Sequence, residues 1–155
     1  MTKKITCSAL SILFTLLICS FLSISALAQD GATTPGPVSR VTLYKVAPGK
    51  MDDVIKDMRE HLKPLYDEYQ KQGLIVSYGI IQNSTTENAD DWSIGQVVSF
   101  KDWTAFGDFN SKTAPISLKH YGSAENRAAI VAKRNQMRTV VSSRLMRSLI
   151  LNPIK

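Results

Sequence analysis

The sequence predicts an α+β fold, with elements in the order βαββαβ, an antiparallel sheet and helices on one of its faces. Two observations support this prediction. The first is the stretch 47–81, where a turn leads into one long amphipathic helix, a glycine stop and a β-rich run. The second is the order of the remaining segments, in which strand-like runs flank a second helical region. Such an order closes as a split βαβ sheet.

The long helix follows the turn 47–50, and its apolar residues recur at three- and four-residue spacing, which lines one face of a helix. That face consists of Met51, Val54, Ile55, Met58, Leu62, Leu65, Tyr66 and Tyr69. Gly73 ends the helix because glycine adopts the left-handed C-cap conformation without steric cost. Residues 74–81 then read as a strand. Pro64 removes one backbone hydrogen bond, so we expect a kink or a break near 61–64.

Two further strands are predicted, one before the long helix and one after residues 74–81. The range 38–46 alternates between two sets of side chains, which is typical of a half-buried strand. Residues 91–100 have strand composition and follow 74–81 after a polar loop. The strands 74–81 and 91–100 should form an antiparallel hairpin.

The second helical region begins near Asp102, which resembles a capping pair together with Ser99. We expect residues 113–122 to be irregular around Pro115. An alanine-rich helix then follows over 124–134, with a serine before it as the cap.

The last segment, 136–151, fits two structures equally well. Met137, Val141, Leu145 and Leu149 lie four apart and suit a helix, whereas a run of β-branched residues and serines favours a strand. We predict a strand, because the sheet then closes in the order given above.

The N-terminal residues 1–28 have the composition of a cleaved secretory signal peptide. Lys3 and Lys4 precede an apolar core that ends in Ala26-Leu27-Ala28. A positive start, an apolar core and a small-residue exit are together typical of such a signal. The core is long enough for an uncleaved membrane anchor, but the small-residue exit favours cleavage near Ala28. We therefore predict an exported protein, periplasmic or secreted, that is not membrane-bound after cleavage.

Cleavage changes the composition of the mature protein. Both cysteines, Cys7 and Cys19, leave with the signal, so no disulfide and no thiolate ligand remains. The formal net charge falls from +6 to +4, with no Lys/Arg-rich run, and this pattern gives no support for nucleic-acid binding. Residues 29–37 are rich in Gly, Pro and Thr and read as a flexible leader. Residues 38–151 are then one domain.

Two passages resemble a known superfamily. They are the turn 47–50 into the long helix, and residues 97–106, where a strand passes into a helix with an aromatic residue after an alanine. Both resemble the dimeric α+β barrel superfamily of ferredoxin-like domains, which includes antibiotic-biosynthesis monooxygenases, haem-degrading monooxygenases and the NIPSNAP type. The resemblance covers roughly residues 38–150 and implies a homodimer, in which the bare sheet face packs on a second subunit or encloses a cavity with it.

The bare face of the sheet is the predicted ligand surface. If Val41 and Leu43 meet the helices, the residues that alternate with them face away. Extended to the other strands, this phase gives as candidate pocket residues Arg40, Thr42, Tyr44, Tyr78, Gln96 and Arg144. A one-residue error in phase would exchange each of them for its neighbour.

His120 is a further candidate, as a haem ligand. In haem-degrading members of the superfamily, a histidine about three turns beyond the aromatic residue of the second helix ligates the iron, and His120 follows Phe109 at about that distance. The rest of the pattern departs from those enzymes: Thr42 stands in place of an asparagine, Phe109 in place of a tryptophan, and Pro115 interrupts the helix. We predict no cofactor, with haem as the alternative, and no metal site, because zinc-binding spacings are missing from the sequence.

Three functions remain after these exclusions. The favoured one is an exported homodimer that binds a small apolar or aromatic molecule in the cavity between the two sheets. The second is a cofactor-independent monooxygenase of the antibiotic-biosynthesis type, in which the substrate itself activates oxygen and the protein supplies a dry pocket. The third is a purely structural dimer. No catalytic constellation decides between binding and catalysis.

Overall fold

The computed structural model describes residues 31–85, 88 and 90–154. The predicted signal peptide, 1–28, therefore lies outside the described residues. The chain divides into two compact units, and the α+β fold belongs to the larger one, Pro35–Ile150. In the smaller unit, the backbone N–H of Asn152 donates to the carbonyl of Ala32 at 2.8 Å.

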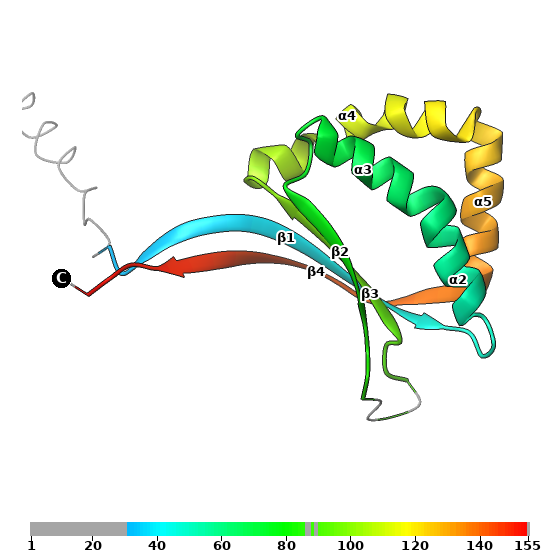
Figure 1. Ribbon diagram of the computed structural model, residues 1–155, viewed down its shortest axis with the longest axis horizontal. Coiled ribbons are helices and arrows are strands. Elements are labelled where there is room, and N and C mark those ends of the chain that lie inside the picture. The colour runs from blue at the N-terminus through cyan, green and yellow to red at the C-terminus, as the bar shows by residue number, and fades with distance from the viewer. Residues whose placement is uncertain (1–30, 86–87, 89, 155) are drawn as a thin grey trace, which may run out of the picture. The chain divides into compact units, whose positions relative to one another are not determined.

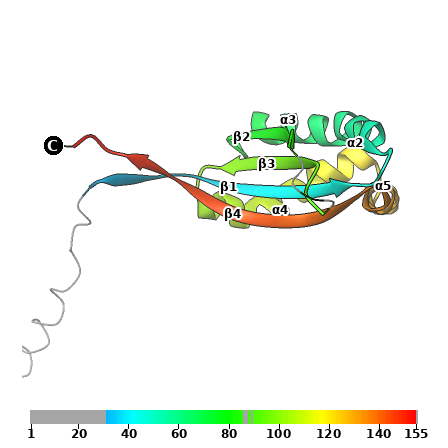
Figure 2. The same cartoon turned by 90° about the horizontal axis from the view of Figure 1, so that it is seen from below.

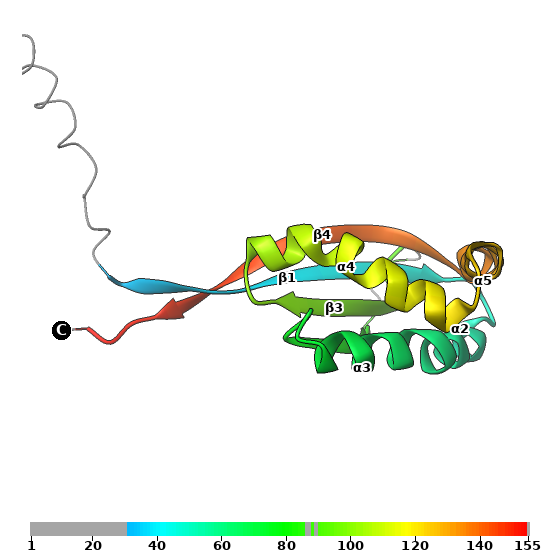
Figure 3. The same cartoon turned by 90° about the horizontal axis from the view of Figure 1, so that it is seen from above.

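The elements follow the predicted order. They are β1 (Thr33–Val46), α2 (Met51–Asp57), η1 (Met58–Leu62), α3 (Lys63–Lys71), β2 (Ser77–Gln82), β3 (Ile94–Phe100), α4 (Trp103–Tyr121), α5 (Ala124–Met137) and β4 (Arg138–Leu151) (Figure 1). The sheet order is β2-β3-β1-β4, and β3 runs antiparallel to both β1 and β2. Figure 2, seen from below, shows the strands in front, and Figure 3, seen from above, shows the helices in front. The helices therefore cover one face of the sheet. This is the predicted ferredoxin-like α+β fold.

The long helix has the predicted irregularity. The π-helical segment η1 ends at Leu62, two residues before Pro64, and lies between the α-helical segments α2 and α3. Proline cannot donate a backbone hydrogen bond, and the wider turn accommodates this loss. Gly73 follows with φ of 69°, in the left-handed region, and ends the helix as predicted.

The second helical region differs from the prediction. The helix α4 continues through Pro115, so the expected irregular segment 113–122 is wrong. Phe109, Thr113 and Ser117 are buried at four-residue spacing on both sides of the proline, and this packing outweighs one lost hydrogen bond. Asp102 alone caps α4, because its Oδ1 accepts from the Ala105 N–H at 2.8 Å.

The predicted capping role of Ser99 is also wrong. Ser99 belongs to β3, and its Oγ lies 2.9 Å from the Oγ of Ser39 on β1. By contrast, Ser123 caps α5 as predicted, because its hydroxyl oxygen accepts from the Asn126 N–H at 3.1 Å.

The bounds of strands β1 and β4 differ from the predicted ones. The range 136–151 is largely strand β4, which confirms the choice of strand over helix. The strand β1 begins at Thr33, so residues 33–37 of the predicted leader are strand. Gly36 allows the two strands to approach, because a Cβ there would lie 2.9 Å from the Cβ of Ser148.

The phase of β1 is opposite to the prediction. Arg40 lies opposite Val98, and Thr42 opposite Gln96. Opposed residues of an antiparallel pair share a face, and Val98 belongs to the core beneath the helices. Arg40, Thr42 and Tyr44 therefore lie on the helix-covered face of the sheet, and Val41 and Leu43 lie on the bare face.

The core between helices and sheet is split into two hydrophobic clusters. One contains Leu65, Tyr69, Ile75, Val98, Phe100 and Phe109, and the other contains Val54, Met58, Leu62, Ile94 and Met137. On β3, Val98 belongs to the first cluster and Ile94 to the second. Gln96 lies between them and is 7% exposed. A polar centre thus occupies the middle of the helix–sheet interface.

Candidate functional site

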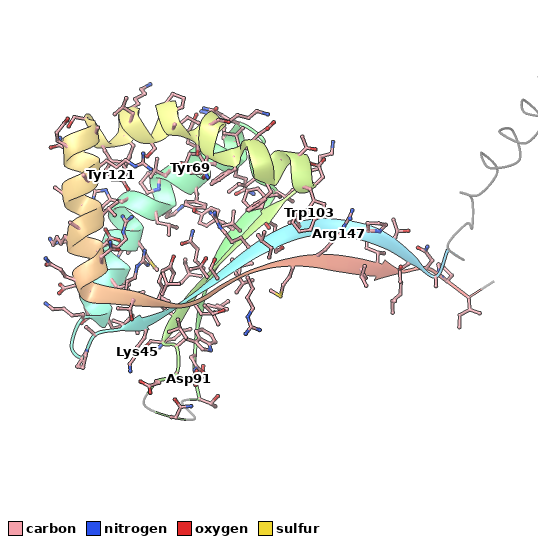
Figure 4. All side chains as sticks on the ribbon, turned by 180° about the vertical axis from the view of Figure 1, so that it is seen from behind. Lys45, Tyr69, Asp91, Trp103, Tyr121 and Arg147 are labelled. Atoms are coloured by element: carbon pink, nitrogen blue, oxygen red, sulfur yellow. The ribbon has the colours of Figure 1, made fainter. Side chains whose placement is uncertain are left out.

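A cavity of about 360 Å³ lies at this polar centre. It is lined by Arg40, Thr42, Tyr44, Leu62, Leu65, Tyr66, Gln96, Tyr121, Arg134, Arg138 and Ser143. These residues come from strands β1, β3 and β4 and from the helix layer, where Tyr121 lies near the corner between α4 and α5 (Figure 4). Its size and its mixture of aromatic, apolar and polar walls are typical of a small-molecule site.

Arg134 lines the cavity and forms an ion pair with Asp57. Its Nε donates to Asp57 Oδ2 at 2.7 Å, and its Nη2 donates to Asp57 Oδ1 at 3.1 Å. The two side chains are only 18% and 11% exposed. Burial lowers the pKa of Arg134, but the hydrogen bonds to Asp57 and Tyr121 raise that pKa above its ordinary value. Arg134 is therefore charged, and Asp57 neutralises it.

Arg138 is buried differently. It is 8% exposed, and its guanidinium carbon lies 4.1 Å from the centroid of the Tyr44 ring, in a cation–π contact. Its Nη1 is buried without a hydrogen-bond partner among the described residues. Burial, together with the neighbouring charge of Arg134, lowers the pKa of Arg138.

The tyrosines supply hydroxyl groups to the same space. The Tyr44 hydroxyl donates to Gln96 Oε1 at 3.4 Å. Burial raises the pKa of Tyr66, although Arg40 and Gln96 beside its hydroxyl act to lower it. Tyr66 therefore stays protonated at neutral pH, and its hydroxyl can donate a hydrogen bond to a ligand.

The structure brings four of the predicted pocket residues together. The cavity is lined by Arg40, Thr42, Tyr44 and Gln96, but it lies under the helices, so their predicted place between two sheets is wrong. Tyr78 lies opposite Val98, so its predicted place on the bare face is also wrong. Its ring lies 5.3 Å from that of Tyr66, and its hydroxyl donates to Asp67 outside the cavity.

Arg144 lies apart from this group. It follows Ser143, whose hydroxyl is 3.2 Å from that of Thr42 on the cavity side. Because successive side chains of a strand alternate, Arg144 points to the opposite face of the sheet.

His120 also lies away from the cavity. Its Nε2 is 3.2 Å from Nδ1 of His61, and the two rings meet edge to face. The ring of Tyr121 packs against both histidines. Burial lowers the pKa of His120, and the neighbouring His61 lowers it further.

Sequence reasoning missed Arg134 and Arg138. Both lie where the chain passes from α5 into β4, a place where arginine is ordinarily solvated. The correct phase of β1 would have pointed to Arg138, because it puts Tyr44, whose ring lies against the Arg138 guanidinium, on the helix-covered face.

No group of three or more His, Cys, Asp or Glu side chains in 31–85, 88 and 90–154 is placed to hold a metal ion. None of the helices in those ranges is long and apolar enough to cross a membrane.

The fold and the cavity define the class: a ferredoxin-like α+β domain with a polar cavity between its helices and its sheet. No protein-family model matches the sequence, and no curated protein matches it. Among solved structures, a dimeric ferredoxin-like protein from an uncultured marine organism is 10% identical, with a TM-score of 0.49 over 79% of this chain and 93% of the other. HapK from Hahella chejuensis is 12% identical, with a TM-score of 0.46 over 76% and 98%. A dimeric ferredoxin-like protein of unknown function from Thermobifida fusca is 10% identical, with a TM-score of 0.44 over 74% and 92%.

Proposed function

We propose that this protein is an exported, homodimeric binding protein that holds a small organic molecule with an aromatic or apolar part. The molecule lies in the cavity between the helices and the sheet of each protomer. The observation that carries this proposal is the hydrophobic core split around a polar cavity. A single domain depends on its core for stability, and an unfilled polar cavity lowers that stability.

The walls suit such a molecule. Leu62 and Leu65 offer apolar surface, and the tyrosines offer ring faces and hydroxyl groups. Thr42 and Gln96 add side-chain donors and acceptors on the sheet side. A ligand with a planar apolar body and a polar end matches this distribution.

The bare sheet face supports the dimer. Val41 lies opposite Val97, and Leu43 lies opposite Gly95, away from the helices. A Cβ on Gly95 would come within 2.9 Å of Leu43 Cδ2 and 2.7 Å of Ile81 Cγ1, so these apolar side chains close over the glycine. An apolar sheet face is typical of an interface, and a second copy would bury it symmetrically. Light scattering on the mature protein should give twice the chain mass.

Export rests on the composition of residues 1–28. The protein recovered outside the cytoplasm should begin at Gln29, which N-terminal sequencing checks. A protein that retains its N-terminus and stays with membranes would contradict cleavage near Ala28.

Binding is tested on the mature protein purified from its own exported fraction. Native mass spectrometry should show extra mass on each protomer, and a panel of aromatic compounds should raise the melting temperature. Thr42→Leu, which narrows the cavity, should abolish both effects, whereas Thr104→Leu, at an exposed position of α4, should leave both unchanged. Oxygen consumption with quinols would assign the cavity to an enzyme instead. If no compound in the panel binds the wild type and no mass co-purifies, the proposal fails.

A further inference from the structure

We propose that the ligand of this cavity carries an oxyanion, a carboxylate or a phosphate, and that Arg138 and Arg40 bind it. This inference rests on the proposed function, because it names the chemical class of the molecule that the cavity holds.

The charges of the lining do not balance. Three arginines line the cavity, and none of the lining residues is acidic. Asp57 neutralises Arg134 through two hydrogen bonds from behind the wall. In the described part of the chain, Arg40 and Arg138 form no ion pair. The cavity therefore carries an excess of positive charge on side chains that are partly or fully shielded from solvent. A bound anion would offset this charge.

Arg138 also has an unused donor. Its side chain is more than nine-tenths buried, and its Nη1 has no partner among the described residues. A buried N–H group without an acceptor destabilises the fold, the more so on a charged group. A ligand oxyanion would accept a charge-assisted hydrogen bond from this nitrogen, which is stronger than a bond between neutral groups.

Tyr44 holds this donor in place. The guanidinium carbon of Arg138 lies over the Tyr44 ring, 4.1 Å from its centroid, in a cation–π contact that leaves the Nη1 N–H groups without an acceptor. Arg138 is thus held in place before the ligand binds, which lowers the entropic cost of binding.

Arg40 supplies the second positive charge from β1. Its guanidinium carbon lies 5.6 Å from the centroid of the Phe109 ring, and its side chain is half-buried. It lies on the same face of β1 as Thr42 and Tyr44, and all three line the cavity. An oxyanion held by Arg138 would also be attracted by this charge.

The test uses three probes of similar shape: benzoate, phenyl phosphate and the neutral benzamide. Titration calorimetry on the mature wild-type protein should show that at least one anion binds about tenfold or more tightly than benzamide. The anion that binds more tightly identifies the group. Arg138→Gln should remove this preference, and Arg40→Gln should reduce it several-fold. Arg59→Gln, an exposed arginine of η1 outside the cavity, should leave it unchanged.

The outcomes separate the two proposals. Equal affinity for benzamide and the anions would overturn the oxyanion and leave the binding cavity intact. Failure of all three probes, with no co-purifying mass, would overturn both. If Arg138→Gln does not fold, Arg40→Gln decides, because a full anion preference without Arg40 would also refute the assignment.

Discussion

At the scale of single residues, the cavity distinguishes two buried arginines that the sequence presents alike. Arg134 has its carboxylate partner within the protein, whereas Arg138 has a ring beneath it and an unpaired nitrogen. Arg134 therefore has its counter-charge without a ligand, whereas Arg138 has a buried donor that only a ligand or solvent can satisfy. Their responses to mutation should therefore differ.

Asp57→Asn should destabilise the protein by about 3 kcal/mol, because it leaves the Arg134 guanidinium buried without a counter-charge. The free energy of unfolding from urea titration measures this loss. Asp52→Asn, on the exposed side of α2, should change that free energy by less than about 0.5 kcal/mol. Similar small effects at both positions would mean that solvent, and not Asp57, compensates Arg134.

The histidine pair should make stability depend on pH. Burial, and then the neighbouring His61, lower the pKa of folded His120 below 6.5, so between the two values the unfolded chain binds more protons than the folded one. This contribution to the free energy of unfolding is fully present above pH 6.5 and is lost as the pH falls through the lowered pKa of the folded state. Urea titrations at stepwise lower pH should show the loss, and His120→Gln should flatten it. An unchanged slope in the variant would place the titrating group elsewhere.

At the scale of elements, helix ends and helix interiors were decided by different forces. Local side chains set the ends: Asp102 and Ser123 cap α4 and α5, and Gly73 ends α3. Burial decided the interior, since α4 continues through Pro115 with buried residues on both sides. A proline is therefore weak evidence for a break when the helix has a buried face to keep.

Asp102→Ala should lower the free energy of unfolding by about 1 kcal/mol, because the Ala105 N–H loses its acceptor. Chemical denaturation measures this loss, and Asp102→Ser should recover most of it, since serine also caps helices. An exposed α4 position, Asn110→Ala, serves as the control. Equal stability of Asp102→Ala and the wild type would show that water replaces the cap.

At the scale of the whole molecule, the sheet has one face beneath helices and one apolar face that the described chain leaves without a helix layer. Leu43 and Ile81 close over Gly95 on that second face. A charge placed there should prevent association of two copies, because an unpaired carboxylate at an apolar interface is costly to bury.

Leu43→Asp should convert the proposed dimer into a monomer, which light scattering detects as half the mass. Leu118→Asp, on an exposed site of α4, should remain dimeric. Circular dichroism checks that both variants stay folded. A folded Leu43→Asp dimer would move the interface away from the bare sheet face.

The sequence by itself determined the order of elements, the glycine stop at Gly73, the Ser123 cap and the irregularity before Pro64, because each depends on neighbours along the chain. It also grouped Arg40, Thr42, Tyr44 and Gln96. Only the tertiary structure decided which face of β1 the helices cover. Arg40 and Tyr44 have apolar stems and polar ends, so they suit either a bare face or the wall of a cavity, and periodicity cannot choose between these. Arg138 entered the site for the same reason, since its burial depends on a tertiary contact with Tyr44 of β1.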